Sequence, residues 1–265
     1  MKKKQLAQNT LFVGSGKGGV GKSTISINLS VALSQKGFNV GIFDADLYGP
    51  SIPIMLGLRS LSPQISKTLD GKEVVIPFTK FGIKALSLGF FVEESRSIVW
   101  RGPVLHNTLG KMINDTEWGE LDYLIVDLPP GTGDIPLSLS QLIQIDGAIV
   151  ICTPQEVAML DAIKSINAFH QLEIPLYGII ENMSGFTVPD TEITYNLFGE
   201  GKGKELAYRF NTPLLGSVPL LPILCLGSDE GRPAAALNVG DGVSEHFSNL
   251  ASAIIEQCNN KSIIG

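Results

Sequence analysis

The chain has 265 residues, of which 44% are hydrophobic, so it is long enough to bury a sizeable core in one domain. Its formal net charge of −6 and its pI of about 5.1 exclude a bulk positive field, so we expect neither nucleic acid nor an anionic membrane as a partner. Three widely spaced cysteines, and apolar runs far shorter than the ~18 residues of a membrane span, indicate a cytoplasmic protein.

Short apolar runs rich in β-branched residues alternate with longer helical stretches along the chain. This alternation predicts an α/β fold with a mostly parallel sheet and helices on both faces, in a single domain over residues 1–265. We expect residues 1–8 to be disordered and residues 57–90 to form an excursion with a small hairpin near Gly71. The expected strands are residues 10–13, 40–44, 123–127, 148–152 and 176–181.

A phosphate-binding motif follows the first expected strand. Residues 16–23 read Gly-Lys-Gly-Gly-Val-Gly-Lys-Ser, which matches the P-loop pattern in full. Glycines let backbone N–H groups turn inward around phosphate oxygens, and the N-terminus of the following helix adds partial positive charge. We expect Lys22 to bridge the β- and γ-phosphates, the Ser23 hydroxyl to ligate Mg²⁺ and Thr24 to contact the α-phosphate. The other expected nucleotide-binding residues of the loop are Gly16, Gly18, Gly19, Val20 and Gly21. A glycine-rich turn without a ligand is the alternative.

The segment after this loop, residues 25–34, is ambiguous by periodicity alone. Apolar and polar residues alternate as in a half-buried strand, yet Ile25, Leu29 and Leu33 also have helical spacing. Because a P-loop is followed by a helix, we predict a helix that ends at Gly37.

Acidic residues end the second and third expected strands, where ligands of open α/β sheets bind. Asp44 and Asp46 follow the second strand, and a capping or turn role is the alternative for each. The third strand is a buried run ending in Asp127, which is typical of a Walker B motif whose carboxylate binds Mg²⁺ directly or through water. Gly131, in the next loop, can bring its N–H close to the γ-phosphate.

A second lysine within the loop, Lys17, is not needed in an ordinary P-loop. With Lys22 it makes the loop resemble the deviant Walker A motif of the MinD, ParA, nitrogenase iron protein and Mrp ATPases. The resemblance implies a homodimer in which Lys17 reaches the partner's nucleotide and stabilises charge as the phosphoryl group departs. A solvated loop lysine is the alternative. The resemblance also implies that Asp44 holds the Mg²⁺ shell through water and that Asp46 orients or activates the attacking water.

Asn182 follows the last long apolar run, where this superfamily has its adenine-binding asparagine. A carboxamide offers a donor and acceptors to the adenine edge, and a turn-forming asparagine is the alternative. The Asn-Lys-x-Asp sequence typical of GTP-selective P-loop proteins does not occur in the chain, so we expect ATP.

Further motifs lie at residues 100–103, 118–122, 127–134, 153–156, 182–184 and 198–201. Together they resemble the Mrp/ApbC group of iron–sulfur carrier ATPases, which pass [4Fe–4S] clusters to apoproteins. The resemblance implies apoprotein clients or iron–sulfur assembly factors as partners. In that group a Cys-x-x-Cys follows the Asn-Met-Ser element, but Val188 and Thr191 occupy those positions here, so we predict no iron–sulfur ligands. Cys152 and Cys258 are expected to pack in the core, and Cys225 near a helix start.

The sequence therefore predicts a Mg²⁺-dependent dimeric switch of the Mrp group that binds ATP and hydrolyses it slowly, in a dimer-dependent way. Cluster transfer would lack the bridging cysteine pair. A nucleotide-gated adaptor with negligible turnover and a positioning ATPase of MinD or ParA type are the alternatives. The MinD-type alternative is less favoured, because the apolar face of the C-terminal helix has hardly any lysine nearby, unlike the basic tails that bind membranes.

Overall fold

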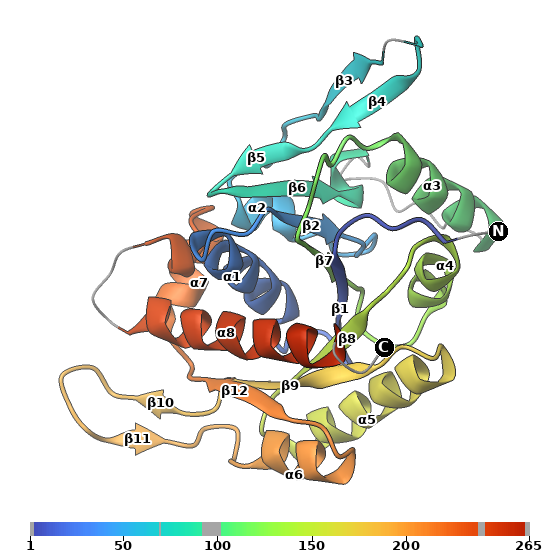
Figure 1. Cartoon of the computed structure of the whole chain (residues 1–265). Helices are drawn as coiled ribbons and strands as arrows, with labels where there is room; N and C mark the ends of the chain where they lie inside the picture. Colours follow the sequence, from blue (N-terminus) through green and yellow to red (C-terminus); the bar gives the residue numbers. More distant parts are fainter. Residues whose placement is uncertain (1–2, 69, 92–101, 238–241, 263–265) are drawn as a thin grey trace.

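An eight-stranded sheet forms the centre of the structure, a computed structural model that describes residues 3–68, 70–91, 102–237 and 242–262 (Figure 1). The strand order is β12-β9-β8-β1-β7-β2-β6-β5, and neighbouring strands run parallel except β5, which is antiparallel to β6. The strands are β1 (Asn9–Ser15), β2 (Val40–Asp44), β5 (Phe78–Lys80), β6 (Ile83–Ser87), β7 (Tyr123–Asp127), β8 (Gly147–Cys152), β9 (Leu176–Asn182) and β12 (Leu214–Val218). The predicted α/β fold with a mostly parallel sheet is confirmed.

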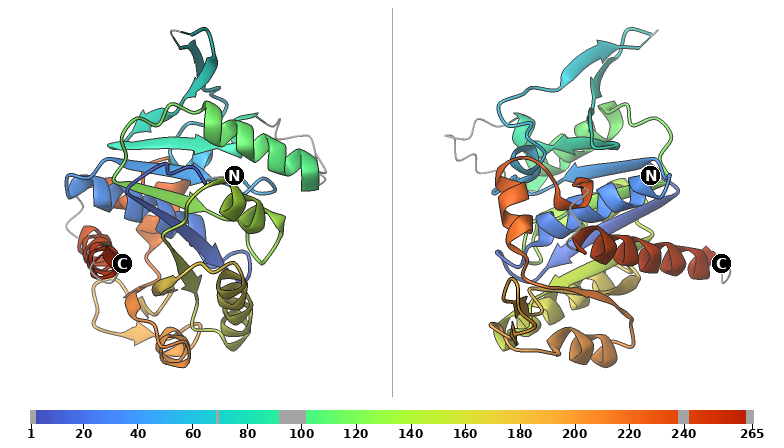
Figure 2. Two further views of the ribbon diagram at one scale, coloured as in Figure 1. Left: turned by 45° about the vertical axis from the view of Figure 1, so that its right-hand side comes forward. Right: turned by 90° about the vertical axis from the view of Figure 1, so that its left-hand side faces the viewer.

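Helices cover both faces of this sheet (Figures 1 and 2). Side chains alternate between the faces along each strand, so in β1 Leu11 and Val13 join one hydrophobic cluster and Phe12 joins the other. The first cluster includes residues of α1 (Lys22–Gln35), α2 (Ile52–Met55), α7 (Pro222–Asp229), η2 (Ala234–Ala236) and α8 (Val243–Ser262). The second includes residues of α3 (Gly102–Asp115), α4 (Asp134–Leu142), α5 (Glu156–Gln171) and α6 (Lys202–Arg209).

Helix α1 is buried around most of its circumference, which explains its ambiguous sequence pattern. The apolar residues of its middle turns are buried, but Ser26, Asn28 and Ser30 are buried as well. The side chains of Asn28 and Ser30 donate to backbone carbonyls four residues earlier, Asn28 Nδ2 to Thr24 at 2.8 Å and Ser30 Oγ to Ser26 at 2.7 Å. Polar residues on the inner side of a helix break the amphipathic pattern, so the preceding loop was the better guide.

Two hairpins extend from the body. The antiparallel pair β3 (Gln64–Lys67) and β4 (Glu73–Ile76) lies within the segment 57–90, with Gly71 at a φ of +83° in its turn, and it projects beyond the sheet in Figure 1. The short helix η1 (Leu88–Phe91) follows β6. The second hairpin pairs β10 (Phe186–Thr187) with β11 (Thr194–Tyr195) after β9.

Residues 3–8, part of the segment expected to be disordered, make backbone hydrogen bonds to the body. The Lys4 N–H donates to the Leu142 carbonyl and the Gln144 N–H donates to the Lys4 carbonyl, both at 3.0 Å. Residues 1 and 2, and residues 100 and 101 of the first carrier-type motif, lie outside the described residues. Among the described helices, none has the length and apolar content needed to cross a bilayer.

Candidate functional site

The predicted site residues meet at the carboxyl ends of β1, β7 and β2, in the middle of the sheet (Figure 1). The register of these neighbouring strands pairs Val13 with Asp127 and Asp127 with Asp44. The glycine-rich loop leaves β1 directly, and the two acidic residues end the strands beside it. Parallel pairing therefore brings together three segments that are far apart in the sequence.

The loop between β1 and α1 curves around a cavity of about 230 Å³. Gly19 and Gly21 have φ angles of +80° and +82°, a region that side chains disfavour. Gly21 is also the N-cap of α1, so the partial positive charge of this helix faces the cavity. The lining consists of Ser15, residues 17–24, Asp46, Gly49, Ser51, Met55 and Pro130. Every predicted loop residue except Gly16 thus lines one cavity.

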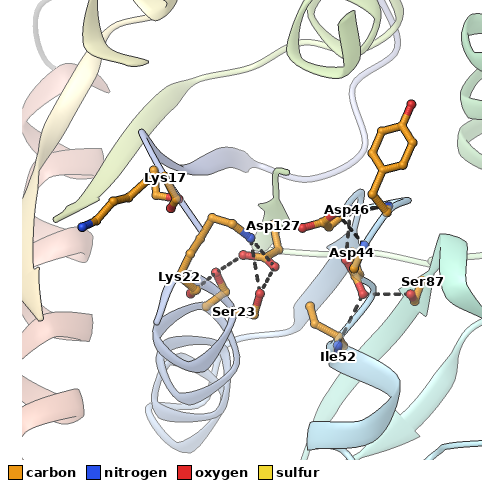
Figure 3. Close-up of polar contacts among 12 residues, drawn as sticks. Lys17, Lys22, Ser23, Asp44, Asp46, Ile52, Ser87 and Asp127 are labelled. Carbon is orange, nitrogen blue, oxygen red and sulfur yellow. Dashed lines mark hydrogen bonds and ion pairs between the residues drawn. The ribbon is translucent and has the colours of Figure 1, made fainter. Parts of the chain in front are cut away.

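Asp127 is the centre of a polar network at this loop (Figure 3). Its side chain is fully buried, and its Oδ2 accepts hydrogen bonds from Lys22 Nζ at 2.8 Å and from Ser23 Oγ at 2.6 Å. Ser26 Oγ donates to Oδ1 at 2.7 Å. A buried carboxylate is costly unless it is paired and hydrogen-bonded, and three donors from α1 meet that need. Ser26, one turn after Lys22, is a member of this network that sequence reasoning missed.

Asp44 lies beside Asp127 at the end of β2 and is also fully buried. Its Oδ2 accepts hydrogen bonds from Ser87 Oγ at 2.8 Å and from the Ile52 N–H at 3.4 Å, and its Oδ1 accepts one from the Asp46 N–H at 3.1 Å. Burial, and then the nearby charge of Asp127, raise the pKa of Asp44 to about 7. Two adjacent buried carboxylates therefore share this corner of the site.

Asp46 combines the turn role with a place at the cavity. Its Oδ1 accepts hydrogen bonds from the N–H groups of Tyr48 at 3.2 Å and Gly49 at 3.1 Å, as in an Asx turn. The residue lines the cavity and is only 9% exposed. Burial raises the pKa of Asp46, and the charge of Lys22 opposes that rise.

The oxygen donors at this corner fit a magnesium ion. Asp127 Oδ2 and Ser23 Oγ are 2.6 Å apart, and the Asp44 carboxylate is on the adjacent strand. Hard carboxylate and hydroxyl oxygens are the ligands Mg²⁺ prefers, and it is commonly held by one or two carboxylates together with phosphate oxygens. Ser23 and Asp127, with Asp44 on the adjacent strand, are the residues that would hold such an ion.

Asn182 and Gly131 contact the loop from its two sides. Asn182, buried at the end of β9, donates through Nδ2 to the Val20 carbonyl at 2.8 Å and lines a second cavity of about 270 Å³ beside the loop. The Gly131 N–H donates to the Ser15 carbonyl at 2.9 Å, and Gly131 lines a different cavity from the one at the loop. Asn182 is thus next to a space outside the cavity at the glycine-rich loop, whereas the Gly131 N–H is bonded to Ser15, the last residue of β1 before that loop.

Lys17 points away from the rest of the network in Figure 3. Its Nζ donates to Gln155 Oε1 at 2.9 Å, at the start of α5. Gln155 belongs to one of the carrier-type motifs, at residues 153–156, but its type and position gave no reason to expect a contact with the loop.

The three cysteines are free thiols, and Cys225 lines the second cavity beside the loop together with Asn182. Cys152 and Cys258 are buried in the core, where burial raises the pKa of Cys152 to about 12, and Cys225 is exposed on α7. Val188 and Thr191 form the turn of the β10–β11 hairpin, where the Val188 carbonyl accepts Thr191 Oγ1 at 2.9 Å. Over the described ranges, no three His, Cys, Asp or Glu side chains gather where they could hold a metal.

Comparison with known proteins assigns the chain to a family. The family model described as ParA, NUBPL iron-transfer P-loop NTPase, matches residues 6–255. The chain belongs to this family. It is 42% identical over 255 residues to an iron-sulfur cluster carrier protein of Aquifex aeolicus, which covers 96% of this chain and 69% of that protein. It is 44% identical over 227 residues to a protein of the same description from Deinococcus radiodurans, and it spans 63% of that protein's length.

Solved structures agree with this family of P-loop NTPases. A nucleotide-binding protein of Archaeoglobus fulgidus, solved in complex with ADP, is 36% identical and has a TM-score of 0.73, with 86% of this chain and 88% of that chain covered. The cell division ATPase MinD of Pyrococcus furiosus has a TM-score of 0.68 at 19% identity, over 94% of this chain and 99% of that one. The MinD likeness shows the shared fold.

Proposed function

We propose that this member of the NUBPL family is a Mg²⁺-dependent ATPase that acts as a homodimeric switch, with slow turnover that depends on the dimer. The observation that carries the proposal is the network on Asp127. A cationic side chain, Lys22, and a metal-ligating hydroxyl, Ser23, meet one buried carboxylate at the glycine-rich loop, at 2.8 and 2.6 Å. Phosphoryl transfer by P-loop enzymes uses this combination.

In the proposed reaction the loop N–H groups and the N-terminus of α1 hold the phosphates, and Lys22 bridges the β- and γ-phosphates. A magnesium ion held by Ser23 and Asp127 would neutralise charge on the γ-phosphate oxygens. Asp46 orients the attacking water, and because burial raises its pKa, it is a better proton acceptor than an exposed aspartate. Asn182 contacts the adenine from its position beside the second cavity, which favours ATP as the nucleotide.

Lys17 supplies the dimer dependence in this proposal. Its ammonium is held outside the Lys22–Asp127 network of its own subunit, which suits a role at the nucleotide of a second copy. A cation added only in the dimer would stabilise the charge that develops as the phosphoryl group departs.

Phosphate release by the purified protein, followed over a wide range of protein concentration, tests the proposal. We expect the rate per subunit to rise with concentration and level off. Lys17→Ala should bind Mg·ATP as the wild type does but turn over at least about 1,000-fold more slowly, as when an arginine finger is removed. A folded protein with no measurable affinity for Mg·ATP would sink the proposal, and affinity without turnover would favour a nucleotide-gated adaptor.

We also propose that the chain does not bridge an iron–sulfur cluster through a cysteine pair after Asn182, although relatives are named as cluster carriers. Val188 and Thr191 carry no thiolate, and the turn they form is closed by their own hydrogen bond. Anaerobic reconstitution with iron and sulfide tests this. A stable visible absorption band of thiolate-bound iron, retained after gel filtration, would contradict it.

The family likeness supports apoprotein clients or iron–sulfur assembly factors as partners, and the three free thiols suit a reducing, cytoplasmic location. A MinD-like membrane role has less support, because the apolar side of α8 packs into the core through residues such as Phe247 and Ile254. Fractionation of cells that carry a tagged chain, with and without ATP depletion, tests the cytoplasmic location and the absence of membrane binding.

A further inference from the structure

The contact between Lys17 and Gln155 joins the glycine-rich loop to the start of α5. Lys17 Nζ donates to Gln155 Oε1 at 2.9 Å, and the Lys17 side chain extends away from Lys22 and Asp127 (Figure 3). Gln155 is the N-cap residue of α5, yet its side chain makes no capping hydrogen bond to that helix. Glutamine is not among the residues whose side chains commonly cap helices, so its amide oxygen is available to Lys17 without the loss of a cap.

The backbones that carry these two side chains are fixed against each other. A Cβ built on Gly16 would lie 2.0 Å from the carbonyl carbon of Asp161 and 2.4 Å from the nitrogen of Ala162. The main chain of α5 therefore packs directly on the loop residue that precedes Lys17. The Ser15 hydroxyl also donates to the Lys17 carbonyl at 3.1 Å. With both ends held, the hydrogen bond to Gln155 selects one direction for the Lys17 side chain.

The group that accepts the Lys17 hydrogen bond is the neutral amide of Gln155, so it does not neutralise the charge of the lysine. An amide oxygen occupies one of the three N–H donors of the ammonium and leaves its positive charge uncompensated. The carboxylate next along the chain, Glu156, pairs with Lys202 Nζ at 2.6 Å, and Lys202 also pairs with Glu205. The contact thus orients Lys17 through an uncharged group, while the neighbouring acid pairs with another cation.

We infer that Gln155 is a positioning residue for the proposed ATPase reaction. It holds the Lys17 ammonium in one direction, with two donors and the full charge available to the nucleotide of a second copy. A free lysine side chain loses conformational entropy when it is fixed in one rotamer. If Gln155 fixes Lys17 before two subunits associate, less of this entropy is lost on reaching the transition state. This inference rests on the proposed function, because it assigns Gln155 an effect only through Lys17.

The test replaces the acceptor without removing the bulk. Gln155→Met is close in size but has no acceptor oxygen, and Gln155→Ala removes the side chain. We expect both variants to lower the maximal rate of phosphate release per subunit about 10- to 100-fold, as for loss of one hydrogen bond to a charged group, with KM for ATP changed less than about twofold. Gln171→Met, at the exposed far end of the same helix, is the matched control and should keep the wild-type rate.

A double-mutant cycle separates this role from a structural one. In the Lys17→Ala background, Gln155→Met should have no further effect on the rate, because the group it orients is gone. An equal further loss in that background, or a wild-type rate for Gln155→Met alone, overturns the inference. A faster rate for Gln155→Met also overturns it, because the contact would then restrain Lys17. If Lys17→Ala itself keeps the full rate, the proposed function has failed, and that result is distinguishable from the others.

Discussion

The packing of the α5 main chain against the glycine-rich loop predicts different effects of substitution at two glycines of that loop. At Gly16 an added Cβ would meet backbone atoms of α5 at 2.0, 2.2 and 2.4 Å. At Gly18 it would meet no heavy atom within 4 Å, and Gly18 does not need a positive φ. Gly16→Ala and Gly18→Ala are therefore chemically identical changes two residues apart with opposite packing consequences.

The magnitude follows from these distances. Non-bonded carbon atoms pack best at about 3.5–4.0 Å, so relief at position 16 requires a shift of about 1.5 Å between the loop and α5. A flexible side-chain end could yield cheaply, but the obstacle here is helix main chain. Overpacking commonly costs about 1–3 kcal/mol, and we expect Gly16→Ala to lower the free energy of unfolding by about 3 kcal/mol. Gly18→Ala should change it by less than about 0.5 kcal/mol.

Urea unfolding of the two variants without nucleotide measures the difference. With a slope of about 3 kcal/mol per molar for a chain of this size, the midpoint of Gly16→Ala should fall by about 1 M relative to Gly18→Ala. The slope itself should stay constant, which shows that the unfolded reference is unchanged. Equal midpoints for the two variants would refute the direct contact between α5 and the loop.

Three further variants test other residues of the site. Lys22→Met should weaken Mg·ATP binding, measured by calorimetry, by on the order of 3 kcal/mol or about 100-fold, because a buried charged contact to the phosphates is lost. The pKa of Asp44 is 3.8 in the unfolded chain and about 7 in the folded protein, so its contribution to stability is present at low pH and is lost as pH rises from about 4 to 7. The midpoint of urea unfolding should therefore fall over this pH range in the wild type. The Asp44→Asn variant should show a smaller fall. Asn182→Ala leaves the buried Val20 carbonyl without its donor and should lower the unfolding free energy by about 1–3 kcal/mol, measured by thermal unfolding.

The glycine-rich loop and Asp127 could be predicted because each is a local signal with one structural meaning. The spacing of the glycines restricts the backbone over a few residues, and a buried run ending in an acid defines a strand end. Ser26 could not be assigned in this way. A serine inside a helix usually bonds its own backbone, but the single Ser26 hydroxyl proton has the closer acceptor in Asp127 Oδ1, at 2.7 Å against 3.0 Å for the Lys22 carbonyl, which only the tertiary arrangement reveals.

Contacts made by the backbone alone, or between segments far apart in the chain, could not be predicted from the sequence. The polar start of the chain suggested disorder, but Lys4 is held through its main chain, which any residue could supply, and through its ammonium, which donates to the Ile113 carbonyl at 3.1 Å. The edge strand β12 was not expected, because Gly216 and Ser217 interrupt a short run that is only partly buried. Gln155 lies 138 residues from Lys17, and a lone glutamine carries no pattern that points to a partner.

The arrangement around Asp127 limits what is lost when Lys22 exchanges partners in the proposed reaction. Lys22 Nζ bonds Asp127 Oδ2, but Oδ1 is bonded separately by Ser26. If Lys22 turns to the phosphates, Asp127 keeps the hydrogen bond from Ser26 and still has Ser23 beside Oδ2. The Gly131 N–H bonds the Ser15 carbonyl and so attaches the loop after β7 to the end of β1. Asp127 and the glycine-rich loop therefore keep their relative positions during that exchange. Breaking a buried ion pair commonly costs about 3–5 kcal/mol, so the two remaining hydrogen bonds offset only part of the loss at Asp127, and the new contact of Lys22 with the phosphates has to supply the rest.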